Sequence, residues 1–311
     1  MNRGSVSCKV LTVAVLLLSV TVARAEGLRV TLLGTGSPQM FRSGPSILVE
    51  AGSEKLLFDC GRGAAQQLFR LKISLAVVQT LFFTHLHSDH VVGFPDLWLN
   101  GWTPAGGGRK DPMRIWGPSG TEAMIANLQK AYEFDLHIRR DVDEHLPAEG
   151  VMVVAKDIEA GLIYERNGVK VTAFEVDHGP VKPAFGYRVE YAGKSVVLSG
   201  DTRFSDNLIR SSNGADLLIH EVISPDAYPQ PFNEITKKII AHHTTPEQAG
   251  EIFTRVKPKL AVYSHITPGN VKVEDLIAST RKTYAGPLEV GADLMSFDIG
   301  DKIEVHRPAA P

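Results

Sequence analysis

Three histidines and an aspartate occur within six residues, at His85, His87, Asp89 and His90. Neutral imidazole nitrogens and carboxylate oxygens are good ligands for Zn²⁺ and similar transition metals. Residues two apart in an extended backbone point to the same side, so His85 and His87 are expected to converge on one ion. Asp89 and His90 follow where the chain turns and can face a second ion. A solvated loop with unrelated histidines is not favoured, because the pattern directly follows the apolar run 81–83.

Three further candidate ligands, His178, Asp201 and His265, each come within three residues of the end of a predicted buried strand. Any one of them alone would more often be a hydrogen-bonded residue at a strand end than a metal ligand. Because all three share the same context, we predict that they complete a dinuclear metal site together with the contiguous motif.

The elements that must position these side chains are short apolar strands and amphipathic helices. Strands are predicted at residues 28–33, 46–50, 55–59, 81–83, 114–116, 169–176, 185–191, 195–198, 217–221 and 260–263. Helices are predicted at residues 64–71, 121–134 and 246–256. Thr245 is expected to be the N-cap of the last helix, with Pro246 at its first position. No repeat or linker divides the chain, so the pattern predicts one α/β domain.

The order of the motifs resembles that of the metallo-β-lactamase-fold hydrolases. The segment 85–90 resembles the signature of this family, and five other motifs resemble its ribonuclease Z branch. These motifs lie at residues 32–38, 58–61, 199–202, 215–221 and 243–249. The same branch is similar to zinc-dependent arylsulfatases, to some phosphodiesterases and to β-lactam-hydrolysing relatives. The resemblance implies a four-layer αββα sandwich, the metallo-β-lactamase fold, in a single domain.

The resemblance also implies how the ligands are shared between two Zn²⁺ ions, with Mn or Fe as alternatives. One ion would be held by His85, His87 and His178, and the other by Asp89, His90 and His265. Asp201 and a hydroxide would bridge the two ions, which lowers the pKa of the bridging water. Asp89 would in addition orient the hydroxide, which makes it a catalytic candidate as well as a ligand.

Glu221 and His243 resemble the carboxylate and imidazole that protonate the leaving group in the ribonuclease Z branch. A carboxylate can select the tautomer of its imidazole and raise its basicity, so the pair suits general acid catalysis. The alternative is structural, with Glu221 at a strand end and His243 at the start of a helix. We favour the catalytic interpretation.

Trp98 and Trp102 follow the metal motif directly and share one helical face. They are candidate substrate-binding residues that could contact an aryl group beside the metals. Packing in the core is the alternative, and the sequence does not separate the two.

Residues 1–25 have the pattern of a signal peptide. Arg3 and Lys9 form a basic region, residues 10–22 are apolar, and Ala23-Arg24-Ala25 is a typical cleavage site. The apolar run is short for a membrane span, which needs about 20 residues. We therefore predict a mature domain at residues 26–311 and a periplasmic or secreted location.

Charge and cysteine content limit the function further. Cleavage removes three basic residues and no acidic ones, which leaves 30 basic and 35 acidic residues and a net charge of −5. Proteins that bind nucleic acids usually present a basic surface, and no Lys/Arg run here exceeds two residues, so a nucleic-acid partner is not favoured. Only Cys60 remains after cleavage, so no intramolecular disulfide can form.

The leading prediction is an exported dinuclear zinc hydrolase that cleaves small esters, with aryl sulfates or phosphodiesters as substrates. The alternatives are tRNA 3′ processing of the ribonuclease Z type and β-lactam hydrolysis. The segment after the metal motif departs from the ribonuclease Z pattern, and no insertion resembles the tRNA-gripping arm of that branch. A non-enzymatic metal-binding protein is least favoured because no ligand is missing. The oligomeric state is open, with a homodimer as one option.

Overall fold

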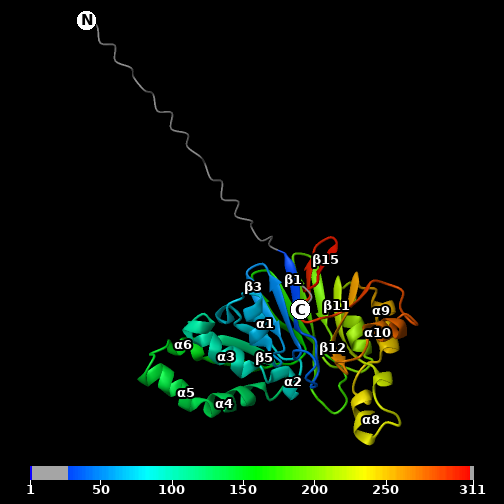
Figure 1. Cartoon of the computed structure of the whole chain (residues 1–311), viewed down its shortest axis with the longest axis horizontal. Helices are drawn as coiled ribbons and strands as arrows, with labels where there is room; N and C mark the ends of the chain where they lie inside the picture. Colours follow the sequence, from blue (N-terminus) through cyan, green and yellow to red (C-terminus); the bar gives the residue numbers. More distant parts are fainter. Residues whose placement is uncertain (2–26, 309–311) are drawn as a thin grey trace.

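The computed structural model describes residue 1 and residues 27–308, which fold around two β-sheets (Figure 1). The predicted signal peptide therefore lies outside the described residues, except for Met1. Within residues 27–308, the first sheet has eight strands in the spatial order β15-β14-β1-β2-β3-β4-β5-β6. The second sheet has seven strands in the order β13-β12-β11-β10-β9-β8-β7.

The bounds of the elements follow the apolar runs of the sequence. The strands are β1 (Leu28–Gly34), β2 (Ser46–Ala51), β3 (Glu54–Phe58), β4 (Thr80–Phe82), β5 (Met113–Gly117), β6 (Val153–Asp157), β7 (Gly161–Arg166), β8 (Val169–Glu175), β9 (Phe185–Tyr191), β10 (Lys194–Leu198), β11 (Leu217–Ile223), β12 (Leu260–Thr267), β13 (Leu288–Val290), β14 (Ser296–Ile299) and β15 (Ile303–His306). The α-helices are α1 (Ala64–Arg70), α2 (Ser88–Val91), α3 (Phe94–Trp102), α4 (Thr121–Ala131), α5 (Glu133–His137), α6 (Ala148–Val151), α7 (Asp206–Ser211), α8 (Glu234–Ala241), α9 (Pro246–Val256) and α10 (Val273–Thr280).

Central strands are buried on both faces, and their successive residues pack in different cores. In β4, Phe82 packs between the two sheets, whereas Leu81 packs under the outer helices of the first sheet. In β11, Ile219 packs between the sheets and Leu218 packs under the helices of the second sheet. Each such burial contributes roughly 1.5–3 kcal/mol relative to an exposed side chain. This double burial explains the continuous apolar runs in the sequence.

The helices cover the outer faces of both sheets. Helices α1, α3 and α4 pack on the first sheet, and α7, α9 and α10 pack on the second. Figure 1 shows these groups on opposite sides of the strands. The structure thus has the layers α, β, β and α in one domain, which confirms the predicted fold class. In the part of the chain that the structure describes, no helix has the length and apolar character needed to span a membrane.

The two sheets are joined where β4 ends and the metal motif begins. The backbone N–H of Phe185 donates to the carbonyl of Thr84 at 2.9 Å, and the Tyr187 hydroxyl donates to the carbonyl of Phe83 at 2.7 Å. Both contacts connect β9 of the second sheet to the end of β4 in the first. They hold the motif that follows β4 against the opposite sheet.

Several predicted elements have different bounds in the structure. Strand β12 continues through His265, which adopts φ 44° where the pairing of β11 with β12 shifts register. His265 is therefore a residue within an irregular strand, not one that follows a strand end. Strand β11 continues past Glu221, because its last residues pair with Ile266 and Thr267 of β12. The predicted helix 121–134 is divided into α4 and α5, whereas α9 begins at Pro246 with Thr245 as its N-cap, as predicted.

Candidate metal centre

Four side chains from three separate segments converge at the edge where β4 and β10 end. The candidate ligand atoms of His85, His87, His178 and Asp201 all lie within 4.8 Å of one another. His178 Nε2 lies 3.4 Å from His87 Nδ1. Asp201 Oδ2 lies 3.9 Å from Nε2 of His85 and 3.9 Å from Nε2 of His178. This group contains the residues that the sequence analysis assigns to one ion and to the bridge.

A second group lies against the first. The ligand atoms of Asp89, His90 and His265 also lie within 4.8 Å of one another. Asp89 Oδ2 is 3.3 Å from His265 Nε2 and 3.6 Å from His90 Nε2. Asp201 Oδ2 is 3.4 Å from His90 Nε2 and 3.3 Å from His265 Nε2. Asp201 therefore contacts the imidazoles of both groups, which is the position that a bridging ligand requires.

The donor atoms of both groups fit divalent transition-metal ions. His85 Nε2, His90 Nε2 and Asp201 Oδ1 are buried and have no hydrogen-bond partner in the described chain. Buried polar atoms without a partner are uncommon in folded proteins, so a cluster of them calls for a ligand. Neighbouring ligand atoms of a tetrahedral zinc with bonds of about 2.1 Å lie about 3.4 Å apart. The separations of 3.3–3.9 Å around Asp201 match this spacing.

The electrostatics favour the metal-binding forms of His85, His87, His178 and Asp201. Burial lowers the pKa of His85 well below its ordinary value and also lowers the pKa of His87 and of His178. Burial acts to raise the pKa of Asp201, but His265 and the other imidazoles around it lower that pKa well below its usual range. Neutral imidazoles and an ionised carboxylate are the forms that bind a metal.

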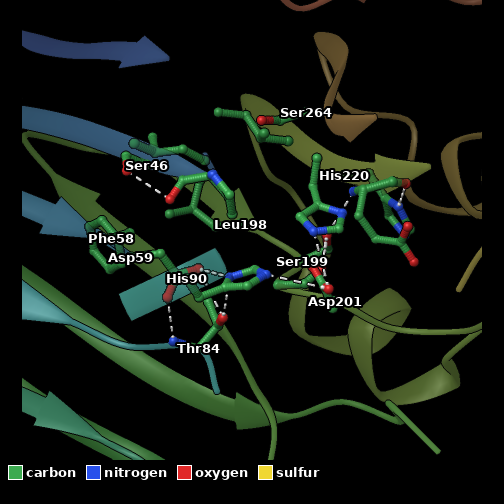
Figure 2. Close-up of a pocket in the computed structure, with 16 residues that line it drawn as sticks. Ser46, Phe58, Asp59, Thr84, His90, Leu198, Ser199, Asp201, His220 and Ser264 are labelled. Carbon is green, nitrogen blue, oxygen red and sulfur yellow. Dashed lines mark hydrogen bonds and ion pairs between the residues drawn. The ribbon is translucent and has the colours of Figure 1, made fainter. Parts of the chain in front are cut away.

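Asp59 and Thr84 hold His90 and His85 in place, as Figure 2 shows for His90. Asp59 Oδ2 lies 2.8 Å from His90 Nδ1 and accepts a hydrogen bond from the Thr84 hydroxyl at 2.9 Å. The same hydroxyl lies 3.0 Å from His85 Nδ1. Such partners select the tautomer that presents Nε2 to the metal. Burial acts to lower the pKa of His90, but Asp201 and Asp59 raise it well above its ordinary value.

Asp59 lies in one of the family motifs, at residues 58–61, but the sequence alone gives it no role at the site. Asp59 adopts φ 55°, a left-handed conformation that is uncommon for residues other than glycine. A carboxylate that directly follows a buried strand is the signal that could have found it. Its partner is 31 residues further along the chain, which local patterns do not reveal.

His243 and Glu221 form an ion pair beside the metal ligands. His243 Nδ1 lies 3.2 Å from Glu221 Oε2, and Glu221 Oε1 accepts a hydrogen bond from the Thr244 backbone at 2.9 Å. The His243 ring lies 5.1 Å from that of His178 and 5.6 Å from that of His265. Burial acts to lower the pKa of His243, but Glu221 and Asp201 raise it to about 9. A raised pKa favours the protonated imidazole that a general acid requires.

The two neighbouring histidines have different surroundings. His220 is buried and its ring packs against Phe253, 5.8 Å between centroids, so it is part of the packing behind the site. The backbone carbonyl of His242 lies 3.1 Å from His178 Nδ1. This contact orients His178 in the same way that Asp59 orients His90.

The structure contradicts the substrate-binding assignment of Trp98 and Trp102. Both side chains are fully buried in the core under the first sheet. The indole N–H of Trp98 donates to the carbonyl of Val151, and that of Trp102 donates to the carbonyl of Pro147, each at 2.8 Å. These partners satisfy the polar atom of each ring away from the metal ligands. The shared helical face therefore points into the core, because α6 covers it.

Cys60 is a packing residue. The thiol is buried in the core under the first sheet, and its pKa is raised by burial and then by the nearby Asp96 and Asp59 carboxylates. A thiol in this environment stays protonated and is a poor nucleophile.

A beta-lactamase superfamily domain model matches residues 54–266, which includes all candidate ligands. The ribonuclease Z of Mycobacterium bovis (strain BCG / Pasteur 1173P2) is 34% identical over 287 residues, covering 90% of this chain and 99% of that protein. The ribonuclease Z of Mycobacterium avium (strain 104) is 36% identical over 286 residues, covering 91% and 100%. The chain belongs to the metallo-β-lactamase-fold hydrolases of this superfamily, in the branch that contains these ribonuclease Z proteins.

Solved structures show the same fold. The metallo-β-lactamase-fold protein YhfI from Bacillus subtilis matches with a TM-score of 0.68 and 19% identity, covering 88% of this chain and 99% of that one. The short form of human tRNase Z matches with a TM-score of 0.63 and 22% identity, covering 86% and 98%. At these identities the likeness concerns the fold. The fold family binds divalent metals, typically zinc, which agrees with the two ligand groups.

Proposed function

We propose that this protein is a zinc-dependent phosphodiesterase that cleaves RNA by chemistry of the ribonuclease Z type. The observation that carries the proposal is the His243–Glu221 pair, 3.2 Å apart and beside both ligand groups. Phosphodiester cleavage expels an alkoxide, which is a poor leaving group without a proton donor. Relatives named ribonuclease Z, matched over almost their whole length, support the same substrate class.

Seven side chains would hold two zinc ions: His85, His87, Asp89, His90, His178, Asp201 and His265. The ions would supply an activated water and stabilise negative charge on the phosphoryl oxygens. Asp89 Oδ2 lies beside His265 and is placed to orient the water through a hydrogen bond. His243 would donate its proton to the departing ribose oxygen, and Glu221 would stabilise the imidazolium before that transfer.

The lack of a long tRNA-gripping insertion does not distinguish this chain from its ribonuclease Z relatives. The chain spans 99% of the ribonuclease Z of Mycobacterium bovis and 100% of that of Mycobacterium avium (strain 104). Proteins that align over nearly their whole lengths contain nearly the same segments, so these relatives have no long insertion that this chain lacks. The comparison therefore favours RNA over the aryl sulfates that the sequence analysis placed first, and no finding supports a sulfatase.

A substrate panel with zinc-loaded mature protein tests the proposal. We expect measurable cleavage of an unstructured oligoribonucleotide and of precursor tRNA, with weaker hydrolysis of bis-nitrophenyl phosphate. Hydrolysis of nitrophenyl sulfate would indicate a sulfatase, and hydrolysis of nitrocefin would indicate a β-lactamase. Preferred turnover of nitrophenyl sulfate, without cleavage of either RNA, would restore the sulfatase hypothesis.

We further propose that residues 1–25 direct export and are removed after Ala25. An exported enzyme would meet RNA outside the cytoplasm rather than the precursors of tRNA processing. Mass spectrometry of protein from periplasmic and cytoplasmic fractions measures this directly. We expect a periplasmic chain that begins at Glu26, and full-length protein confined to the cytoplasm would contradict export.

A further inference from the structure

Two basic side chains lie beside the loop that carries the ligand His178. Arg203 follows the bridging Asp201 by two residues, and its backbone N–H donates to the carbonyl of Asp177 at 2.9 Å. Its guanidinium is half exposed and contacts Asp177 Oδ2 at 2.8 Å through Nη2. Lys182 is exposed and follows His178 by four residues. The backbone N–H of Gly179 donates to Asp177 Oδ1 at 3.1 Å, so Asp177 connects Arg203 to this loop.

A third basic residue, Lys238, belongs to helix α8, which ends beside the loop that carries His178. Lys238 lies four residues before His242, so the two side chains share one helical face. The His242 ring lies over Gly179, where an added Cβ would be 2.7 Å from His242 Cδ2. The His242 ring lies 5.9 Å from that of the ligand His178, and its backbone carbonyl lies 3.1 Å from His178 Nδ1. Arg203 and the helix that carries Lys238 therefore both adjoin the loop that carries the ligand His178.

Helix α8 presents this lysine to solvent. None of its residues is buried, and Figure 1 shows it extending from the body of the molecule. The neighbouring Lys237 is paired with Glu234 at 2.7 Å. Lys238 and Lys182 have no ion pair with any residue in the described part of the chain, and the Arg203 guanidinium has donors beyond the one that contacts Asp177. Hydrogen-bond donors without a partner near the ligand His178 are well suited to bind an anion.

We propose that Arg203, Lys238 and Lys182 form a subsite for a phosphate next to the scissile one, so that the preferred substrate is an RNA strand and not an isolated small ester. This inference rests on the proposed function and names the part of the substrate that the site recognises. A nucleic-acid strand carries a phosphate at every nucleotide, so a bound strand places a second phosphate outside the metal centre. A small diester such as bis-nitrophenyl phosphate has no group that reaches this subsite.

The test compares Arg203→Gln and Lys238→Gln with a matched control, Lys237→Gln, in zinc-loaded mature protein. Each test variant should raise KM for an oligoribonucleotide about tenfold, the effect of one charge-assisted hydrogen bond at the low end of its range. The reduction in kcat/KM on the oligoribonucleotide should exceed that on bis-nitrophenyl phosphate at least fivefold. The slope of log KM against log salt concentration should fall by about 0.7 for each phosphate that a variant no longer binds. Lys237→Gln should keep the wild-type slope.

Metal content and the conservative Arg203→Lys variant separate binding from folding. Arg203→Lys should recover part of the KM effect because it keeps the charge. Equal reductions on both substrates, or the same salt slope in Lys238→Gln and Lys237→Gln, would overturn the subsite. Failure of the wild-type protein to cleave any oligoribonucleotide, with bis-nitrophenyl phosphate hydrolysed, would instead refute the proposed function. The two failures are therefore distinguishable.

Discussion

Replacing Asp201 with alanine is expected to remove metal from both ligand groups and to abolish hydrolysis. Asp201 Oδ2 lies within 3.9 Å of imidazole nitrogens in each group, so one carboxylate serves two positions. Its removal would also leave closely spaced imidazoles without the negative charge between them. Loss of a group that only orients a ligand costs about 10- to 100-fold in metal affinity or activity. Loss of a shared ligand should cost more, on the order of 10³-fold or greater in activity.

Elemental analysis of purified, zinc-reconstituted protein measures this effect. We expect two equivalents of zinc in the wild-type protein and fewer than one in Asp201→Ala, with the fold checked by circular dichroism. Asp206→Ala is a suitable control, because this aspartate is exposed and pairs with Arg255 away from the candidate ligands. Two retained equivalents in Asp201→Ala would exclude Asp201 as a bridging ligand.

Replacing His243 with alanine is expected to slow reactions with poor leaving groups far more than reactions with good ones. General acid catalysis contributes roughly 10²–10⁴-fold, and the contribution shrinks when the leaving oxygen is a weak base. A nitrophenolate departs readily without a proton, whereas a ribose alkoxide does not. His243→Ala should therefore lose about 10²–10⁴-fold on an oligoribonucleotide while it largely retains hydrolysis of bis-nitrophenyl phosphate. Zinc content should stay at the wild-type value.

The pH dependence of the Glu221→Gln variant is the companion experiment. Burial acts to lower the pKa of His243, but Glu221 and Asp201 raise it to about 9, so the acid form is present below that pH and is lost as pH rises through it. For the oligoribonucleotide, kcat should fall on the alkaline side. In Glu221→Gln this fall should begin at a lower pH, because the carboxylate that holds the proton is gone. Equal losses of His243→Ala across a series of leaving groups would mean that His243 binds substrate or metal instead.

Most of the ligand set and the fold class could be predicted from the order of residues along the chain. His85, His87, Asp89 and His90 are contiguous, so their convergence depends only on local backbone geometry after a buried strand. The continuous apolar runs of the central strands follow from burial on both faces, as Phe82 and its neighbours show. Local patterns predict such strands because side-chain direction alternates with a fixed period along a strand. The four-layer arrangement is implied by the resemblance to the family and not by these patterns.

Tertiary packing determines which face of each element is covered and which distant groups meet. A shared helical face at Trp98 and Trp102 suits either a pocket or a core, and the backbone of residues 147–151 settles it by accepting both indole N–H groups. Asp59 reaches His90 across 31 residues, a pairing that no local period encodes. Arg203 and Lys238 form no basic run, yet folding brings Arg203 and the helix of Lys238 to the loop that carries His178. Partners far apart along the chain meet because strand pairing and sheet packing place them together, and the spacing of neighbouring residues does not specify such long-range contacts.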